Sequence, residues 1–280
     1  MLVYIPKTPK PNLPEDYRHL TLLNADLKLL SRILDNCLSP WLPSLLHLSQ
    51  HCGIHKNTIF DTTATVHEVN THAEHSKQPL RILSIHFKEA FDNISHSYLL
   101  TLLTTYGFSA RLQACIHGMY TNTTSTILIN GHTSGPIPIK YLVCQGRPLS
   151  MQLFALCLYP LLRALENTLT GICFGPNNIK TVVIAYADDV RLLVTSPSEI
   201  PNIRTIMEQY GAASGAKINI LKLKAMAVGA WDTSVDIMGI PYHTEMKILG
   251  VHFTNSVRQS AQTSWTKVIG GLTAQARCLF

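Results

Sequence analysis

The sequence predicts an α+β fold, with an antiparallel sheet of the split βαβ type and helices on one face. Its predicted elements follow the order strand, helix, hairpin, helix, strand, which is typical of that fold. The 280 residues are 46% hydrophobic and only 14% charged, so a large buried core is expected rather than a disordered chain. In residues 182–194, two β-prone apolar stretches flank adjacent carboxylates, which predicts a hairpin with the acids at its tip.

The first third of the chain alternates predicted helices with one strand. Residues 26–38 carry an apolar stripe at helical spacing, and a second helix is expected over residues 61–75. Residues 81–87 are rich in apolar side chains and predict a strand. A helix is expected to follow it, beginning near Ser95 or Ser97.

The next elements are marked by capping and turn residues. Ser109 is expected to cap a helix that ends near residue 120. Residues 126–129 predict a strand, the Asn-Gly pair at 130–131 is a hairpin turn signal, and residues 137–143 are the expected return strand.

A long apolar helix is predicted before the acidic hairpin and a second helix after it. Ser150 is its expected N-cap, Pro160 should bend it near its middle, and Gly171 should follow its end at about residue 168. After the hairpin, residues 203–210 have the i, i+3, i+4, i+7 spacing of a packed helix. Three short strands are expected to follow, at residues 217–220, 225–228 and 247–253.

Net charge, cysteine count and apolar segments indicate which partners, metal sites and cellular locations the chain could have. The net charge of +6 fits a polyanionic partner, but a merely basic soluble protein fits as well. The seven cysteines are odd in number and none forms a CxxC pair, so we expect reduced thiols, no disulfides and no zinc site. No apolar leader occurs in residues 1–16, and polar residues interrupt the apolar helix at 151–165, so we expect an intracellular protein, nuclear or cytoplasmic, without a membrane partner.

The tetrapeptide Tyr186-Ala187-Asp188-Asp189 carries the most specific chemistry. Nucleotidyl transfer needs Mg²⁺, a hard cation that binds oxygen ligands and usually takes one or two carboxylates from the protein. A hairpin that presents two adjacent carboxylates could supply them. The alternative is an ordinary Asp-Asp turn between two core strands, because Asp is a common turn residue.

Six segments, in order along the chain, resemble motifs of the reverse transcriptase domain of non-LTR (LINE-type) retrotransposons. Each motif alone is weak evidence, but the six together span most of the chain from Tyr17 to Phe253. They are YRHLTLLN at 17–24, SIHFKEAFD at 84–92, QGRPLS at 145–150, YADD at 186–189, SGAKINILK at 214–222 and LGV at 249–251.

The resemblance implies a right-hand polymerase fold made of fingers and palm, with the split βαβ sheet in the palm. It also implies that the thumb is largely missing and that no endonuclease region precedes Met1. The expected parts are the first part of the fingers at 1–80, the first part of the palm at 81–106, the second part of the fingers at 107–146, the palm with the YADD hairpin at 147–254, and the start of a thumb or connection at 255–280.

The resemblance also assigns roles at the centre of the site. Asp188 would be the main ligand of two Mg²⁺ ions, with Asp189 beside it, and position 86 would complete the catalytic set. Phe91 matches the steric gate that excludes a 2′-hydroxyl, although an ordinary core phenylalanine is the alternative. Lys222 matches the lysine near the triphosphate, which could protonate the leaving pyrophosphate, but a solvated lysine is also possible.

Five further positions match motifs that contact nucleotide or primer. Gln145 and Gly146 would contact the incoming nucleotide or template base, Gly146 because it has no Cβ; the alternative is a plain turn into a helix. Arg18 would bind a phosphate of template or nucleotide, or else be a surface arginine. Leu249 and Gly250 match the primer grip.

The chain departs from the family at His86, where the motif has an aspartate. Imidazole suits zinc, copper or iron better than Mg²⁺, and it brings no negative charge to offset two divalent cations. We therefore expect the two-metal site to be impaired. Other departures fit neutral decay of an element copy, and they fall at His19, His55, Lys56, Leu142, Cys144, Arg147, Met151, Arg191 and Leu223.

Two classes of function follow. The first is an RNA-directed DNA polymerase domain that uses an RNA or DNA template, a DNA primer and dNTPs. The second is a folded, catalytically dead remnant that still binds nucleic acid, and residue 86 favours it for actual activity. A group II intron maturase fits the motifs less closely, and the YADD sequence and Phe91 disfavour a viral RNA-dependent RNA polymerase.

Overall fold

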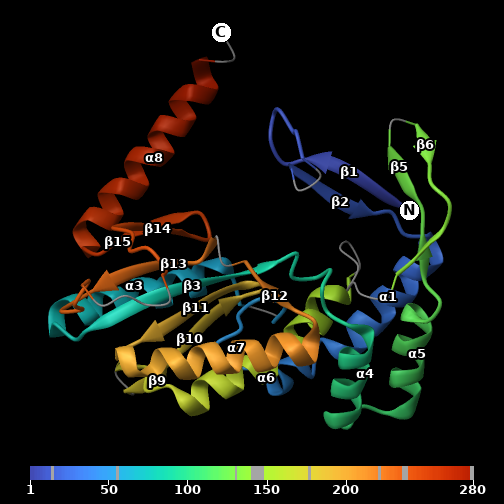
Figure 1. Cartoon of the computed structure of the whole chain (residues 1–280), viewed down its shortest axis with the longest axis horizontal. Helices are drawn as coiled ribbons and strands as arrows, with labels where there is room; N and C mark the ends of the chain where they lie inside the picture. Colours follow the sequence, from blue (N-terminus) through green and yellow to red (C-terminus); the bar gives the residue numbers. More distant parts are fainter. Residues whose placement is uncertain are drawn as a thin grey trace. The chain divides into compact units, whose positions relative to one another are not determined.

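The computed structural model describes residues 1–13, 16–54, 57–129, 131–139, 148–175, 178–219, 222–234 and 239–277. Its backbone forms two compact units. Unit 1 comprises residues 1–46, 88–159 and 210–217, and unit 2 comprises residues 47–87, 160–209 and 218–280. The mixed α+β character predicted from the sequence is confirmed (Figure 1). The assignment of segments to fingers, palm and thumb stays a prediction.

Unit 1 contains a small mixed sheet and a group of helices. The sheet has the order β2-β1-β5-β6, in which β1 pairs antiparallel with β2 and parallel with β5. A separate two-stranded ladder joins β4 to β7. The elements are β1 (Leu2–Pro6), β2 (Tyr17–Thr21), α1 (Ala25–Leu38), α2 (Leu42–Leu45), α4 (His96–Thr105), α5 (Ala110–Tyr120), β4 (Thr124–Ser125), β5 (Ile127–Ile129), β6 (His132–Thr133) and β7 (Ile137–Pro138).

Local signals predicted α1, α4 and α5 of unit 1 but not the short helix α2, and they misplaced one strand. The side chain of Ser95 accepts a hydrogen bond from the backbone of Tyr98, so Ser95 and not Ser97 caps α4, and Ser109 caps α5 as expected. The expected return strand of the hairpin is wrong in position, because β5 pairs with β6 at His132–Thr133 while β7 pairs with β4. The rest of that expected strand, from residue 140 onward, lies outside the described residues.

Each of two long helices has residues in both units. They are α6 (Ser150–Thr168) and α7 (Ile200–Ser214). Both helices were expected, but α6 begins at Ser150, the residue expected to cap it, and α7 extends beyond residues 203–210 at both ends. Pro160 lies inside α6. In the part of the chain that the structure describes, no helix is both long enough and apolar enough to cross a membrane.

Unit 2 is built on an antiparallel sheet with the order β10-β11-β3-β12, and β13 pairs along the same central strand β3. Two small hairpins, β8–β9 and β14–β15, accompany it. The elements are α3 (Ile59–Ser76), β3 (Leu80–Lys88), β8 (Ile172–Phe174), β9 (Ile179–Thr181), β10 (Val183–Tyr186), β11 (Asp189–Val194), the 3₁₀ turn η2 (Pro197–Glu199), β12 (Lys217–Ile218), β13 (Lys224–Val228), β14 (Glu245–Ile248), β15 (Val251–Thr254) and α8 (Val257–Arg277).

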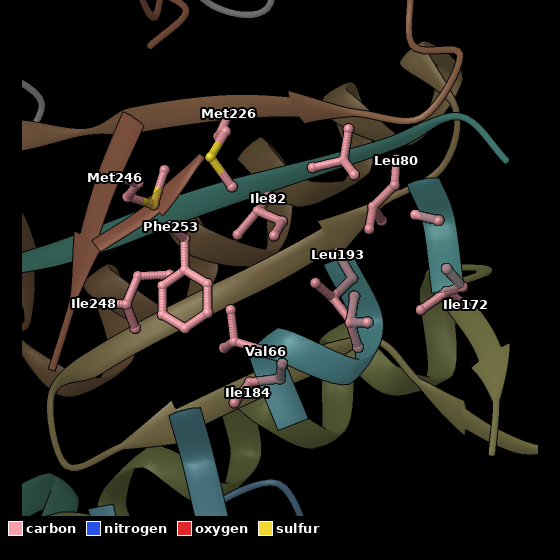
Figure 2. Packing of buried hydrophobic residues seen from close by; sticks show 13 residues of the cluster. Val66, Leu80, Ile82, Ile172, Ile184, Leu193, Met226, Met246, Ile248 and Phe253 are labelled. Atoms are coloured by element: carbon pink, nitrogen blue, oxygen red, sulfur yellow. The ribbon is translucent and has the colours of Figure 1, made fainter. Parts of the chain in front are cut away.

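One face of this sheet packs into the main hydrophobic core of unit 2. Alternate residues of neighbouring strands share a face, so Ile82, Leu193 and Met226 point the same way and are fully buried. Side chains from α3 and from the β14–β15 hairpin complete the cluster, among them Val66 and Phe253 (Figure 2). The core therefore packs against the part of these strands that is distant from the β10–β11 turn, and the same face of the sheet continues toward that turn.

Candidate functional site

The β10–β11 hairpin turns over only two residues, Ala187 and Asp188. Tyr186 and Asp189 pair across the turn, so Asp189 already belongs to the return strand. Ala187 has a φ of 55°, in the left-handed region that costs a non-glycine residue about 1–2 kcal/mol. Such a conformation persists only where neighbouring groups hold it.

The side chain of Gln50 supplies that support. Its Oε1 accepts a hydrogen bond from the Ala187 backbone at 2.9 Å, and its Nε2 donates to the Ala187 carbonyl at 3.1 Å. Gln50 is fully buried, and a parallel bridge between Gln50 and Ala185 aligns its segment with β10. Cys52 also donates its backbone N–H to Gln50 Oε1, at 3.1 Å. Sequence reasoning missed this residue, because a glutamine 137 positions from its partner leaves no local signal.

His86 lies directly opposite Asp189 in the β3–β11 ladder. Cross-strand partners place their side chains on one face, and here His86 Nδ1 is 4.0 Å from Asp189 Oδ1. The other ring nitrogen, Nε2, is 3.1 Å from the Ser84 hydroxyl. The residue that departs from the motif therefore faces the YADD carboxylates.

Arg191 forms a bidentate ion pair with Asp189. Its two terminal nitrogens donate to the two carboxylate oxygens at 2.5 and 2.8 Å. The Arg191 side chain is only 2% exposed, against 21% for Asp189. The sequence marks Arg191 as a charge in an apolar strand, and the two-residue period of a strand would have named Asp189 as its partner.

These charges also set the protonation of His86. Burial is the largest cause that lowers the pKa of His86 below its ordinary value of 6.5, and the nearby guanidinium of Arg191 lowers it further. The carboxylate of Asp189 opposes both effects without reversing them. The imidazole is therefore mainly neutral near pH 7 and adds no negative charge to the site.

The donor set does not suit the two Mg²⁺ ions that the family implies. Both oxygens of Asp189 already accept hydrogen bonds from Arg191, and His86 offers a neutral nitrogen where Mg²⁺ prefers oxygen. Among the described residues, no three His, Cys, Asp or Glu side chains are grouped so that they could hold a metal ion. The chemistry of these side chains is that of an internal ion pair.

The remaining predicted site residues are placed in three ways. Lys222 is exposed and close enough to His86 to lower its pKa. Leu249 and Gly250 form the two-residue turn of the β14–β15 hairpin, with φ values of 48° and 91°. Phe91 belongs to unit 1, where its ring centre is 4.4 Å from that of Phe154.

Of the three remaining residues, Arg18 lies among the described residues and the other two do not. The backbone of Arg18 pairs with Ile5 in the β1–β2 ladder of unit 1. Gln145 and Gly146 lie outside the described residues. The roles expected for all of these residues stay predictions.

Comparisons with known proteins agree with the motifs. Residues 5–253 match the family model described as reverse transcriptase (RNA-dependent DNA polymerase). An uncharacterized 149 kDa protein of transposon TX1 from Xenopus laevis is 30% identical over 230 residues, covering 82% of this chain and 18% of that protein. The Pol polyprotein of a type-1 retrotransposable element R2 from Popillia japonica is 27% identical over 227 residues, covering 81% of this chain and 32% of the polyprotein.

Solved structures support the fold alone, because their sequence identity is low. A chain of an RdRp complex has a TM-score of 0.55 at 12% identity, covering 91% of this chain and 21% of that one. Telomerase from Candida tropicalis, truncated from its C-terminal domain, has a TM-score of 0.53 at 9% identity, covering 82% and 43%. The chain spans between 18% and 32% of the length of its curated relatives. The chain belongs to the reverse transcriptase (RNA-dependent DNA polymerase) family, as a domain related to those of the non-LTR retrotransposons TX1 and R2.

Proposed function

We propose that this chain is a retrotransposon RNA-directed DNA polymerase domain whose nucleotidyl transfer is impaired. In the family's reaction, the 3′-hydroxyl oxygen of the primer bonds to the α-phosphorus of a dNTP, and the bond from that phosphorus to the pyrophosphate leaving group breaks. The family assignment supports the reaction class. The residues facing the YADD turn support the impairment.

The observation that carries the proposal is the pairing of His86 with Asp189. A polymerase site holds its divalent cations with carboxylates at this place, and an imidazole supplies neither the oxygen ligand nor the negative charge. If the substitution removes about 3–5 kcal/mol of transition-state stabilisation, the rate falls roughly 10²–10⁴-fold. Asp188 remains in the turn as the carboxylate on which any residual activity depends.

A second candidate, a catalytically inactive domain that binds nucleic acid, is favoured by the Asp189–Arg191 ion pair. With both oxygens of Asp189 engaged by Arg191, that carboxylate of the YADD pair is not available to a metal ion. The chain keeps a net charge of +6, which suits a phosphate backbone. The two candidates predict the same binding and differ in synthesis.

Both are tested with one RNA template and DNA primer. Fluorescence anisotropy of the labelled duplex measures binding, which should weaken steeply as salt rises. Primer extension with dNTPs and Mg²⁺ measures synthesis, and a slow but detectable rate supports an impaired polymerase. Extension as fast as that of an intact reverse transcriptase would refute the impairment, and absence of binding at low salt would refute both candidates.

Two variants make the extension assay specific to this site. Asp188→Asn should abolish any residual synthesis, so synthesis that survives it comes from a contaminating enzyme. His86→Asp restores the motif carboxylate, and it raises the rate only if no other group obstructs the site. Neither change should alter duplex binding by more than about twofold, because neither adds nor removes a lysine or an arginine.

A further inference from the structure

We propose that Arg191 is a built-in counter-ion that occupies Asp189 in place of a metal, so that this chain regains metal binding only when both His86 and Arg191 are replaced. The inference rests on the proposed function, because it concerns the same carboxylates. Arg191 is a second obstacle to metal binding, in addition to His86. The inference also predicts that the single repair at His86 is not enough.

Arg191 lies on β11, opposite Ser84 of β3. On β11, the side chains of Asp189, Arg191 and Leu193 share one face, and across the ladder they meet His86, Ser84 and Ile82. Leu193 and Ile82 are fully buried in the core of unit 2. Arg191 therefore stands at the border between the core and the YADD turn, at a position where an apolar residue would extend the core.

The guanidinium of Arg191 depends on Asp189. Apart from the two bonds to that carboxylate, the described residues offer its guanidinium only the carbonyl of Val190, at 3.2 Å. Its Nε is buried without a hydrogen-bond partner in the described part of the chain. A buried charge that loses its partner is strongly destabilising, so the fold itself holds Asp189 on Arg191.

A divalent cation would compete with Arg191 for Asp189. A metal that took the oxygens of Asp189 would leave the guanidinium unpaired and would stand close to a second positive charge. Metal binding at Asp189 and the Arg191 ion pair are therefore mutually exclusive. The ring of His86, whose Nδ1 is 4.0 Å from Asp189 Oδ1, carries no negative charge in either protonation state and so cannot compensate the metal.

Non-additivity between the two substitutions follows. In His86→Asp, the new carboxylate faces Asp189 with Arg191 still present, so it should join the ion pair rather than open a metal site. In Arg191→Leu, Asp189 is released but still faces an imidazole instead of a carboxylate. Only the double variant offers carboxylates at 86, 188 and 189 without a guanidinium bound to Asp189.

The experiment is a Mn²⁺ titration followed by electron paramagnetic resonance of the free ion, on the full chain without nucleic acid. We expect weak binding by the wild type and by each single variant. The affinity gain of the double variant should exceed the product of the two single gains by at least about tenfold, which corresponds to about 1.4 kcal/mol of coupling. Arg204→Leu is the matched control, because that arginine pairs with Glu208 on the surface of α7 and should change nothing.

Two outcomes overturn the proposal: tight Mn²⁺ binding by His86→Asp alone, or no gain in the double variant. Circular dichroism checks the fold of each variant, and Arg191→Met replaces Arg191→Leu if the latter does not fold. Duplex binding by the wild type is measured in parallel. Failure of duplex binding refutes the proposed function, whereas the Mn²⁺ titration alone decides the role of Arg191.

Discussion

Replacing Asp189 by asparagine should destabilise this chain, which is the opposite of what neutralising one of two crowded catalytic carboxylates does. In a site held open for metal ions, adjacent carboxylates repel each other, so removing one charge relieves the fold. Here the carboxylate satisfies the guanidinium of Arg191, which is 2% exposed. The sign of the change in unfolding free energy therefore reports which arrangement the protein has.

The magnitude follows from the two hydrogen bonds, at 2.5 and 2.8 Å. Each hydrogen bond to a charged group contributes about 1.5–3 kcal/mol, and breaking a buried ion pair by removing one partner costs about 3–5 kcal/mol. Asp189 is 21% exposed, and the asparagine oxygen keeps one of the two bonds, so we expect a loss of about 3 kcal/mol. For a chain of 280 residues that lowers Tm by about 5 °C.

Calorimetry and urea unfolding of four proteins measure the effect as a double-mutant cycle. They are the wild type, Asp189→Asn, Arg191→Leu and the double variant. Arg191→Leu should be near neutral, because an apolar side chain fits beside Leu193, and it should cancel most of the loss caused by Asp189→Asn. Asp188→Asn is the matched control in the same turn. A stabilising effect of Asp189→Asn, or additive effects across the cycle, would contradict the ion pair as the state of the site.

Three further outcomes are expected. Gln50→Leu removes the amide that bonds both backbone groups of Ala187, so the unfolding free energy in urea should fall by about 2–4 kcal/mol, whereas an unchanged midpoint would show that the turn needs no clamp. Burial lowers the pKa of His51 below its ordinary value of 6.5 despite the nearby Asp61. Its contribution to stability is therefore complete above pH 6.5 and is lost as the pH falls toward the folded-state pKa; His51→Gln should flatten this part of the stability profile, and an identical slope would exclude His51 as its source. Iodoacetamide followed by mass spectrometry should label the exposed Cys37 readily and leave the buried Cys157 unmodified in the native state, because burial raises the pKa of that thiol; equal labelling would contradict the burial.

Local patterns predicted the parts of the fold that depend on nearby residues. Ser95 and Ser109 cap their helices because a side-chain oxygen reaches a backbone N–H three residues ahead, a geometry that any chain with that sequence can form. The acidic hairpin was equally local, since two apolar runs separated by a two-residue turn lie close enough to pair with each other. The failure at the other hairpin has a related cause: β5 closes at once with β6, and the more distant β7 goes to β4.

The candidate site was only partly predictable for the same reason. The motif comparison named His86 and the two aspartates, and the partner of Arg191 could have been read from the alternation of a strand. The Gln50 clamp could not, because it joins segments 137 residues apart. Nothing local distinguishes a buried glutamine that holds a turn from one on the surface.

Sequence alone determined the family of this protein, the kinds of elements it contains and the position at which a motif carboxylate is missing. These depend on residue identity and short spacing, which the linear chain carries in full. Tertiary structure decided that His86 faces Asp189, that Gln50 supports the strained turn, and that the guanidinium of Arg191 is buried against a carboxylate. Those facts depend on strand register and burial. An unpaired arginine costs little stability in water, but a buried one is strongly destabilising when it loses its partner.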